Sequence, residues 1–241
     1  MGKQNEISWP RIAAEGTAIV VSILLAFAID AWWQRQNEAK QLDALLVSLH
    51  EDFKSSQAHV DRWLGGNRKI LAALTAFRDQ LASTAIDHEF EVPQEWILAA
   101  IGTPTYSPTD ATLQAAISSG QIELIEDVEL RTRLAMWRQQ VDDTQEDELL
   151  IRQIVVQNLV PALSEQVRLA PAFEFDTIVG WFLDETLPNA DEKLRVTATT
   201  KLEGAVSERL FYTTFVVAGL ADIRQTQADI IQLLENDISG N

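Results

Sequence analysis

Histidine is the first candidate for metal or acid–base chemistry, and the chain has three: His50, His59 and His88. His50 and His59 are nine residues apart, which places them on different faces of a helix. No HExxH or similar spacing brings two of them to one metal ion. The triplet His50-Glu51-Asp52 is contiguous, so its side chains diverge around a helix. We therefore expect solvent-facing histidines and no histidine metal site.

Carboxylates gather between residues 142 and 148, where oxygen ligands for a divalent cation could arise. The run lacks the glycine and the alternating loop pattern of an EF-hand. Its spacing fits the solvated face of a helix better than a chelating loop, so we expect an exposed acidic face. Its members are Asp142, Asp143, Glu146, Asp147 and Glu148.

Motifs for covalent or phosphate chemistry are missing from the sequence. It contains no GxSxG, no P-loop and no GxGxxG. It also contains no cysteine, which excludes disulfides, thiolate catalysis and zinc sites of the cysteine type. We therefore expect a protein that is not an enzyme, with no catalytic residues, no cofactor and no metal ion.

A ligand pocket is the one small-molecule site that the sequence suggests. The loop Gly102–Pro108, which carries Tyr106, is the strongest loop signal in the chain. Trp96, Trp137 and Trp181 could line a pocket together with this loop. Aromatic residues at helical spacing belong more often to a hydrophobic core, so core packing is the favoured interpretation of the tryptophans.

The element that must position everything else is an apolar stretch from Trp9 to Trp33, WPRIAAEGTAIVVSILLAFAIDAWW. As a helix, Trp9 to Trp32 spans about 35 Å, enough to cross a hydrocarbon core of about 30 Å. Tryptophan at both ends of the stretch, Trp9 before it and Trp32 and Trp33 after it, is typical of membrane boundaries. We predict a short tail over residues 1–9, a transmembrane helix over 10–33 and an acidic all-helical extramembrane domain over 34–241.

Two alternatives remain for this stretch. A cleavable signal peptide is suggested by the basic residues Lys3 and Arg11 and by Ala26-Phe27-Ala28, which fits a small-x-small cleavage site. Glu15 inside the apolar region, and the unbroken helical pattern that follows, argue against cleavage. The other alternative is a buried core helix of a soluble protein, because the strictly apolar core has only 14 residues.

A stripe of small and polar residues follows one side of this helix. Small residues recur at every fourth position, and an acidic residue continues the series. Small residues let two membrane helices approach closely, so the stripe predicts contact with a second copy or with another membrane protein. An ion-conducting oligomer would rest on Glu15 alone. The predicted interface comprises Ala14, Glu15, Ala18, Ser22, Ala26 and Asp30.

The acidic balance of the chain excludes some partners. The net charge is −17, and nearly all of it lies beyond residue 33. Such a domain does not bind nucleic acid through phosphate contacts, and an anionic bilayer surface repels it. Solubility is the simplest role of the acidic excess. The partners that we expect are therefore membrane lipid and a protein that contacts the transmembrane helix.

Beyond the apolar stretch, the sequence predicts an all-α fold, a bundle of six to eight helices with no convincing strand. Apolar residues at 3-and-4 spacing extend the first helix from Pro10 to Leu64. Gly65-Gly66 should break this helix and begin a helical hairpin that ends near Ser83. The last predicted helix covers about residues 205–236.

Helix-capping residues mark the middle of the chain. Ser107-Pro108 predicts the start of a helix over 108–118, and Gly120 predicts its left-handed end. An extended linker should follow. Asp127 then predicts the cap of a helix of about 30 residues that Pro161 ends or kinks.

Residues 105–134, TYSPTDATLQAAISSGQIELIEDVELRTRL, carry these features in a recognisable order. A small-residue helix ends at Ser119-Gly120, the apolar stretch Ile122–Ile125 follows, and Asp127 precedes a helix that begins with Leu130-Arg131. Together with Trp32/Trp33 after the apolar helix, this order resembles a family of uncharacterised bacterial single-pass membrane proteins over roughly the first 140 residues. The resemblance implies a retained membrane helix in a bacterial membrane, and that family has no assigned function.

These features favour a non-enzymatic, membrane-anchored helical protein that acts through assembly, as an oligomeric scaffold or an accessory subunit of a bacterial membrane complex. The alternative is a membrane-tethered sensory or ligand-binding domain. The expected location is the bacterial inner membrane. Lys3, Arg11 and the amino terminus slightly outweigh Arg35 and Lys40 beyond the helix, which favours a periplasmic domain.

Overall fold

One helix of 75 residues, α1 (Trp9–Ser83), dominates the computed structural model, which describes residues 9–170, 175–183 and 193–240. The predicted break at Gly65-Gly66 is wrong, because α1 runs through both glycines. A Cβ atom on Gly66 would lie 2.4 Å from the ring of Phe182, whereas one on Gly65 would have nothing within 4 Å. Gly66 therefore allows a close approach of two elements and does not form a turn.

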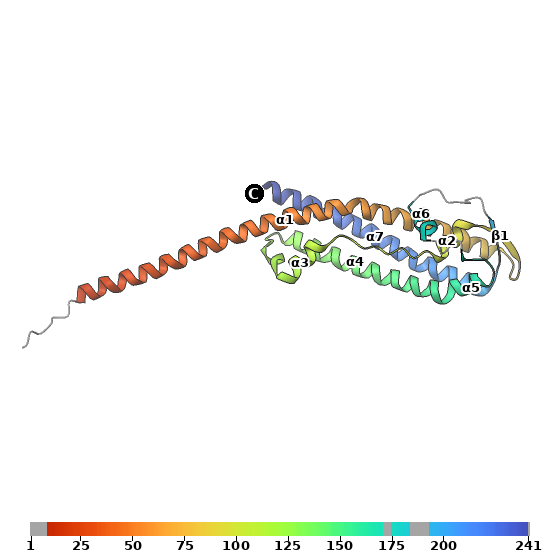
Figure 1. Cartoon of the computed structure of the whole chain (residues 1–241), viewed down its shortest axis with the longest axis horizontal. Coiled ribbons are helices and arrows are strands. Elements are labelled where there is room, and N and C mark those ends of the chain that lie inside the picture. The colour runs from red at the N-terminus through yellow and green to blue at the C-terminus, as the bar shows by residue number, and fades with distance from the viewer. Residues whose placement is uncertain (1–8, 171–174, 184–192, 241) are drawn as a thin grey trace, which may run out of the picture.

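Figure 1 shows that α1 has two parts, an arm that projects alone and a half that packs in a bundle. We call residues 9–41 the arm. Every described side chain between residues 20 and 37 is exposed, and burial begins with Leu45 and Leu46. Between residues 20 and 37, the arm therefore packs against no other part of the described chain.

The bundle consists of the second half of α1, the helix α4 (Val128–Ile154) with its continuation, and α7 (Thr200–Gly240). α7 packs against both α1 and α4. A π-helical turn (Val155–Leu159) joins α4 to α5 (Val160–Ser164), where Pro161 lies in the first turn. Pro161 has no N–H to donate to the preceding turn, and the wider π turn accommodates this missing hydrogen bond. The predicted long helix with an interruption near Pro161 is confirmed.

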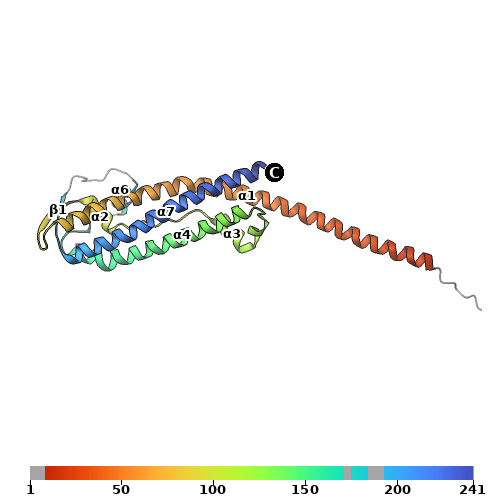
Figure 2. The same ribbon diagram turned by 180° about the vertical axis from the view of Figure 1, so that it is seen from behind.

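An extended segment, residues 102–110, lies between α1 and α4 in both views and occupies the position of a fourth helix (Figures 1 and 2). We call it the strap. It connects α2 (Gln94–Ile101) to α3 (Ala111–Ser119), and a 3₁₀ turn (Gln121–Leu124) follows in place of the predicted extended linker. The predicted helix start at Ser107-Pro108 is wrong, because side chains of α4 and α7 hold the strap extended up to Asp110.

Two of the predicted caps are confirmed. Gly120 ends α3 with φ of 76°, a left-handed conformation that favours glycine. Asp127 caps α4 through its Oδ1 atom, which accepts hydrogen bonds from the N–H groups of Glu129 at 2.7 Å and Leu130 at 3.1 Å. The stripe of α4 is also buried as predicted, at Leu130, Leu134, Trp137 and Val141.

A small antiparallel sheet closes the end of the bundle away from the arm. β1 (Glu89–Pro93) pairs with β2 (Lys193–Thr197), and Phe90 lies opposite Val196. The sequence predicts no strand here, because each strand has only five residues and its partner lies about 100 residues away. The remaining helix, α6 (Phe175–Phe182), packs against α1 and α2. The all-α prediction therefore holds for the bulk of the described chain.

The predicted membrane segment is helical in backbone from Trp9 onward, but the side chains of residues 9–16, 18 and 19 lie outside the described set. Among the residues that the structure describes, no helix combines the length and the apolar character needed to cross a membrane. The prediction of a transmembrane helix over 10–33 thus has no support from the described side chains.

Candidate functional site

The strap is an extended chain that packs along the helical bundle with Gly102, Tyr106 and Asp110 buried, so the backbone N–H and C=O groups at its buried positions need partners other than a helical ladder. Side chains supply the missing partners. The N–H of Tyr106 donates to both carboxylate oxygens of Glu148, at 3.0 and 3.1 Å, and the Nε2 of Gln145 donates to the C=O of Tyr106 at 3.0 Å. From α7, the Nη2 of Arg209 donates to the C=O of Gly102 at 2.7 Å.

Glu148 is almost wholly buried, with 4% of its surface exposed. Burial raises the pKa of its carboxyl from 4.5 to about 7, because a charged carboxylate loses its hydration. The N–H of Tyr106 and the positive charges of Arg152 and Arg209 act in the opposite direction. The group that holds the middle of the strap therefore titrates near neutral pH.

Arg209 is also buried, with 1% of its surface exposed. Burial lowers the pKa of its guanidinium to about 9, and the nearby charge of Glu148 opposes this effect. Within the described chain, its Nε and Nη1 atoms have no hydrogen-bond partner. Arg209 remains charged at neutral pH, so a buried guanidinium from α7 and a buried carboxyl group of α4 that titrates near neutral pH hold the strap.

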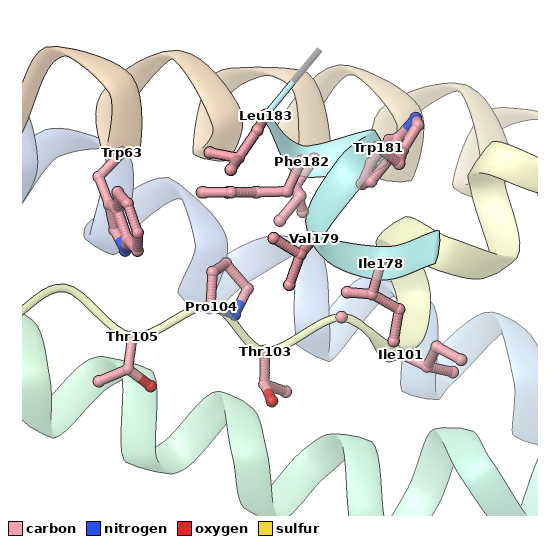
Figure 3. Close-up of a pocket in the computed structure, with 12 residues that line it drawn as sticks. Trp63, Ile101, Thr103, Pro104, Thr105, Ile178, Val179, Trp181, Phe182 and Leu183 are labelled. Atoms are coloured by element: carbon pink, nitrogen blue, oxygen red, sulfur yellow. The ribbon is translucent and has the colours of Figure 1, made fainter. Parts of the chain in front are cut away.

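An apolar cavity of about 550 Å³ lies on the other side of the strap, between α1 and α6. Pro104, Val179, Phe182 and Trp63 surround it from three separate elements (Figure 3). Its size falls in the range of small-molecule sites. The lining residues are Trp63, Ile70, Ile101, Gly102, Thr103, Pro104, Thr105, Ile178, Val179, Trp181, Phe182 and Leu183.

Aromatic contacts fix the walls of this cavity. The ring of Trp63 packs edge-on against Phe182, with centroids 5.5 Å apart, and against His59, with centroids 4.4 Å apart. Lys69 lies over the ring of Trp181, 5.0 Å from its centroid, and donates to the C=O of Trp181 at 2.7 Å. These contacts attach α6 to α1 at two points beside Gly66.

The structure divides the predicted pocket residues into two groups. Trp181 and the first part of the loop, residues 102–105, line the cavity, whereas Tyr106 and Trp137 are fully buried in the core. Trp96 packs against Phe77 and does not line the cavity. Trp63 and Phe182, which no sequence pattern assigned to a pocket, form the aromatic wall. Their helical spacing gave only a core signal, so no local pattern distinguished them.

The histidines differ in part from the prediction. His88 is exposed as expected, but His50 and His59 are half-buried. His50 Nε2 lies 3.3 Å from a carboxylate oxygen of Glu235, and burial lowers the pKa of His59. Across the described residues, no group of three or more potential ligands could hold a metal ion.

The acidic run is exposed as predicted at Asp142, Asp143 and Glu146, but the prediction is wrong for Glu148. Its spacing could have indicated this, because Glu148 lies seven residues after the buried Val141 and so falls on the same helical stripe. No comparable spacing in the sequence indicated that Arg209 is buried.

The predicted membrane-helix residues fall into two sets. Ser22, Ala26 and Asp30 are exposed on the arm, as are the predicted boundary residues Trp32 and Trp33. The side chains of the others lie outside the described residues: Trp9, Ala14, Glu15 and Ala18. No contact described in the structure tests the predicted interface.

A family model described as a family of unknown function (DUF6090) matches residues 15–140. No curated protein and no solved structure matches the chain. The matched region includes the arm from residue 15 onward, the strap and the α1 wall of the cavity, and it ends before Glu148, α6 and Arg209.

Proposed function

The chain belongs to the family of unknown function DUF6090, and we propose from its geometry that it is a membrane-anchored, non-enzymatic helical protein that acts through assembly. The observation that carries the proposal is the surface of the arm. Large apolar side chains are exposed around most of its circumference, with Leu24 62% and Phe27 67% exposed, and only the side of Ser22, Ala26 and Asp30 lacks them. A helix with so wide an apolar surface is normally covered by lipid or by protein.

The proposed membrane segment is residues 10–33 of α1. The apolar surface described by the structure, residues 20–33, has a length of about 21 Å, which is shorter than a hydrocarbon core of about 30 Å. The sequence of residues 10–19 continues the same helical backbone and brings the length to about 36 Å. Exposed Trp32 and Trp33 suit the boundary with water.

The proposed assembly uses the small-and-polar side of the arm. Asp30 is exposed on an apolar helix, and Ser22 and Ala26 precede it at intervals of four residues. A carboxylate near a membrane boundary is stabilised by a polar partner, and small residues allow a second backbone to approach. The partner is a second copy, as in an oligomeric scaffold, or another subunit of a bacterial inner-membrane complex.

Paired variants of the full chain test this proposal. Ala18→Leu with Ser22→Leu adds bulk to the small side, whereas Ile19→Leu with Ile23→Leu changes the bulky side at nearly constant volume. We expect native mass spectrometry in mild detergent, supported by crosslinking, to lose the assembly only in the first pair. Equal assembly of both pairs and the parent would contradict an interface on this side of the arm.

A second candidate function is a sensory or ligand-binding domain held at the membrane. The observation that favours it is the cavity of about 550 Å³, whose apolar lining comes from α1, the strap and α6. Assembly through the arm and ligand binding in the cavity are compatible functions, because the arm and the residues of α1 that line the cavity are separate parts of this helix. They need separate experiments.

A further inference from the structure

We propose that an aromatic cluster on the outer side of α7 docks a basic amphipathic helix of another protein. The cluster comprises Phe211, Tyr212 and Phe215, and we call it the aromatic patch. Three observations carry the proposal: the patch is exposed, it lies along the seam between α4 and α7, and the charges around it are all negative. The proposal goes beyond the arm and the cavity, since it needs neither a membrane contact nor a bound small molecule.

The aromatic patch is a contiguous apolar surface on α7. The ring of Phe211 lies edge-on to Phe215, with centroids 4.9 Å apart, and to Tyr212, with centroids 5.4 Å apart. Phe211 is 57% exposed and Phe215 is 46% exposed. Single exposed apolar residues are ordinary on a protein surface, but aromatic rings that gather there mark a contact with another molecule.

Contacts between α4 and α7 show which side of α7 carries the patch. Thr144 lies against Gly219, and the Nδ2 of Asn158 donates to a carboxylate oxygen of Glu208 at 3.0 Å, so the two helices run antiparallel. Figures 1 and 2 show them side by side. Positions 208, 212, 215 and 219 follow the 4-3-4 spacing of one helical side, so the patch lies along the seam with α4. The matching stretch of α4, residues 144–158, is about 21 Å long, which suits a docked helix of about 16 residues.

Carboxylates surround this seam. On α4, Asp143, Glu146 and Asp147 lie close together, and the pKa of Asp147 is raised by burial and by the charges of the other two. On α7, Glu208 and Asp222 are exposed. Within the described chain, none of these carboxylates forms an ion pair with a lysine or an arginine. Their charge is therefore available to a partner.

The basic residues of these two stretches do not neutralise the seam. Arg152 is the only basic residue of α4 between positions 139 and 157, and it donates to Thr105 on the strap. Arg209 is the only one of α7 between positions 202 and 223, and it is buried with its Nη2 on the C=O of Gly102. The surface that a partner meets is therefore aromatic at its centre and acidic around it.

A basic amphipathic helix is complementary to both properties. Its apolar side covers the rings, and lysine or arginine along the edges of that side meets the carboxylates and the faces of the rings. A second copy that presented the same surface would bring like charges together and would be repelled. An anionic bilayer would be repelled for the same reason. The charge therefore selects a cationic protein segment over a second copy or lipid.

The test uses the full chain in mild neutral detergent, labelled with 4-fluorophenylalanine, and ¹⁹F spectra that give one resonance for each of the nine phenylalanines. Single Phe→Leu variants assign the resonances. The probe is a helical peptide of about 16 residues made of leucine, alanine and lysine, with its leucines on one side. The matched control peptide has glutamate in place of every lysine.

We expect the lysine peptide to shift the resonances of Phe211 and Phe215 and to leave those of Phe53 and Phe77, which are buried in the core, unchanged. The glutamate peptide, with the same apolar side, should shift neither pair. Phe27 lies on the arm and reports peptide that enters the detergent. Such partition lowers the free peptide concentration equally in all variants, so affinities can be compared between variants.

Neutral variants test the charge requirement. Asp147→Asn with Glu208→Gln should weaken binding of the lysine peptide by about three- to tenfold, because two carboxylates beside the patch lose their charge. Asp43→Asn with Glu51→Gln makes the same change of net charge at exposed positions of α1. At about 0.15 M salt, screening over about 8 Å should leave the affinity of this second pair within about twofold of the parent.

Alanine variants test the aromatic requirement at exposed positions, where the fold tolerates the change. Phe215→Ala, followed at the Phe211 resonance, should weaken binding by about five- to tenfold. Leu149→Ala removes an exposed apolar side chain four residues after Gln145, on the side of α4 that faces the strap, and should not alter the affinity.

Several outcomes would overturn the proposal: equal shifts with the lysine and glutamate peptides, equal weakening by the two neutral pairs, or shifts confined to Phe27. Shifts of Phe211 and Phe215 that grow with the concentration of the chain alone would assign the patch to a second copy and would overturn it as well.

Discussion

Glu148 is a carboxyl group buried in a helix stripe whose other positions are mostly apolar. An unpaired buried carboxylate would destabilise the fold strongly. Both oxygens of Glu148 face the N–H of Tyr106, which would otherwise be a buried donor without a partner. Glu148 therefore gives the N–H of Tyr106 a hydrogen-bond acceptor, but its own charged form is disfavoured by burial.

Titration of Glu148 should make stability depend on pH. The folded-state pKa of about 7 lies above the ordinary value of 4.5, so the native state retains a proton that the unfolded state has lost. The stability that this group contributes is fully present below pH 4.5 and is lost as pH rises through 7. The difference corresponds to about 3 kcal/mol.

Chemical unfolding of the full chain between pH 4.5 and 8 measures this effect. Glu148→Gln removes the titration, so its free energy of unfolding relative to the parent should rise by about 3 kcal/mol across the window. Glu146→Gln, a change of the same kind at an exposed neighbour, should follow the parent. A Glu148→Gln protein with the pH profile of the parent would contradict the assignment.

At the scale of elements, the close contact between α1 and α6 depends on Gly66, a residue that the sequence predicts to break the helix. Gly65 and Gly66 are adjacent in a continuous helix, but only Gly66 faces another element. An alanine at Gly65 meets no atom within 4 Å, so the helix gains the propensity of alanine without a clash. An alanine at Gly66 meets the ring of Phe182, which lies against Trp63.

Opposite effects are therefore expected from the same substitution at neighbouring positions. Gly65→Ala should raise the free energy of unfolding by about 0.5–1 kcal/mol. Gly66→Ala should lower it by about 1–3 kcal/mol, because Phe182 must move from its packed position. Thermal or chemical unfolding of the two variants checks this pair. Stabilisation by both substitutions would mean that α6 does not pack on α1 at Gly66.

The strap shows how an extended element can complete a helical bundle. A helix satisfies its own backbone, but the strap depends on Gln145, Glu148 and Arg209 from two other elements. This dependence links the bundle core to the cavity wall, since residues 102–105 of the strap line the cavity. Any change that releases the strap should therefore alter the cavity as well.

At the scale of the whole molecule, an apolar arm is continuous with an acidic bundle. The carboxyl-terminal end of α7 lies beside α1 near the place where the arm leaves the bundle (Figures 1 and 2). The sheet, α2 and α6 lie at the opposite end. If the arm is membrane-embedded, the cavity is far from the bilayer, and a molecule that enters the cavity comes from the aqueous side.

Membrane attachment can be tested with two matched pairs of leucines. Leu24 and Leu25 lie on the arm, and Leu149 and Leu150 lie exposed on α4. Lysine in the middle of a membrane helix costs about 2.5–3.5 kcal/mol per residue. We expect the parent and Leu149→Lys with Leu150→Lys to remain in the membrane pellet after carbonate washing, and Leu24→Lys with Leu25→Lys to be released.

Release of the parent into the wash would refute attachment. For a retained parent, reporter fusions at the carboxyl terminus determine the side: the periplasmic domain that the flanking basic residues predict should give an active phosphatase and a non-fluorescent fluorescent-protein fusion. The reverse pattern would place the domain in the cytoplasm.

Local rules of sequence determined much of the helical framework. The cap at Asp127, the left-handed end at Gly120 and the buried stripe of α4 depend on residues within a few positions of one another, so they were predictable without a fold. The lack of a catalytic motif and the acidic balance are also properties of the chain alone. The apolar stretch is likewise a property of the sequence, although the sequence does not determine whether lipid or protein covers it.

Tertiary structure decided the features that make the candidate site. Gly66 reads as a helix breaker until Phe182, more than 100 residues later, packs against it. The sequence predicts Glu148 to be part of a solvated acidic face, whereas in the structure the backbone N–H of Tyr106 donates to it. β1 and β2 are too short to predict singly and become strands only as a pair. In each case the stabilising partner is distant in sequence, so the free energy that selects the conformation exists only once the bundle has brought the two segments together.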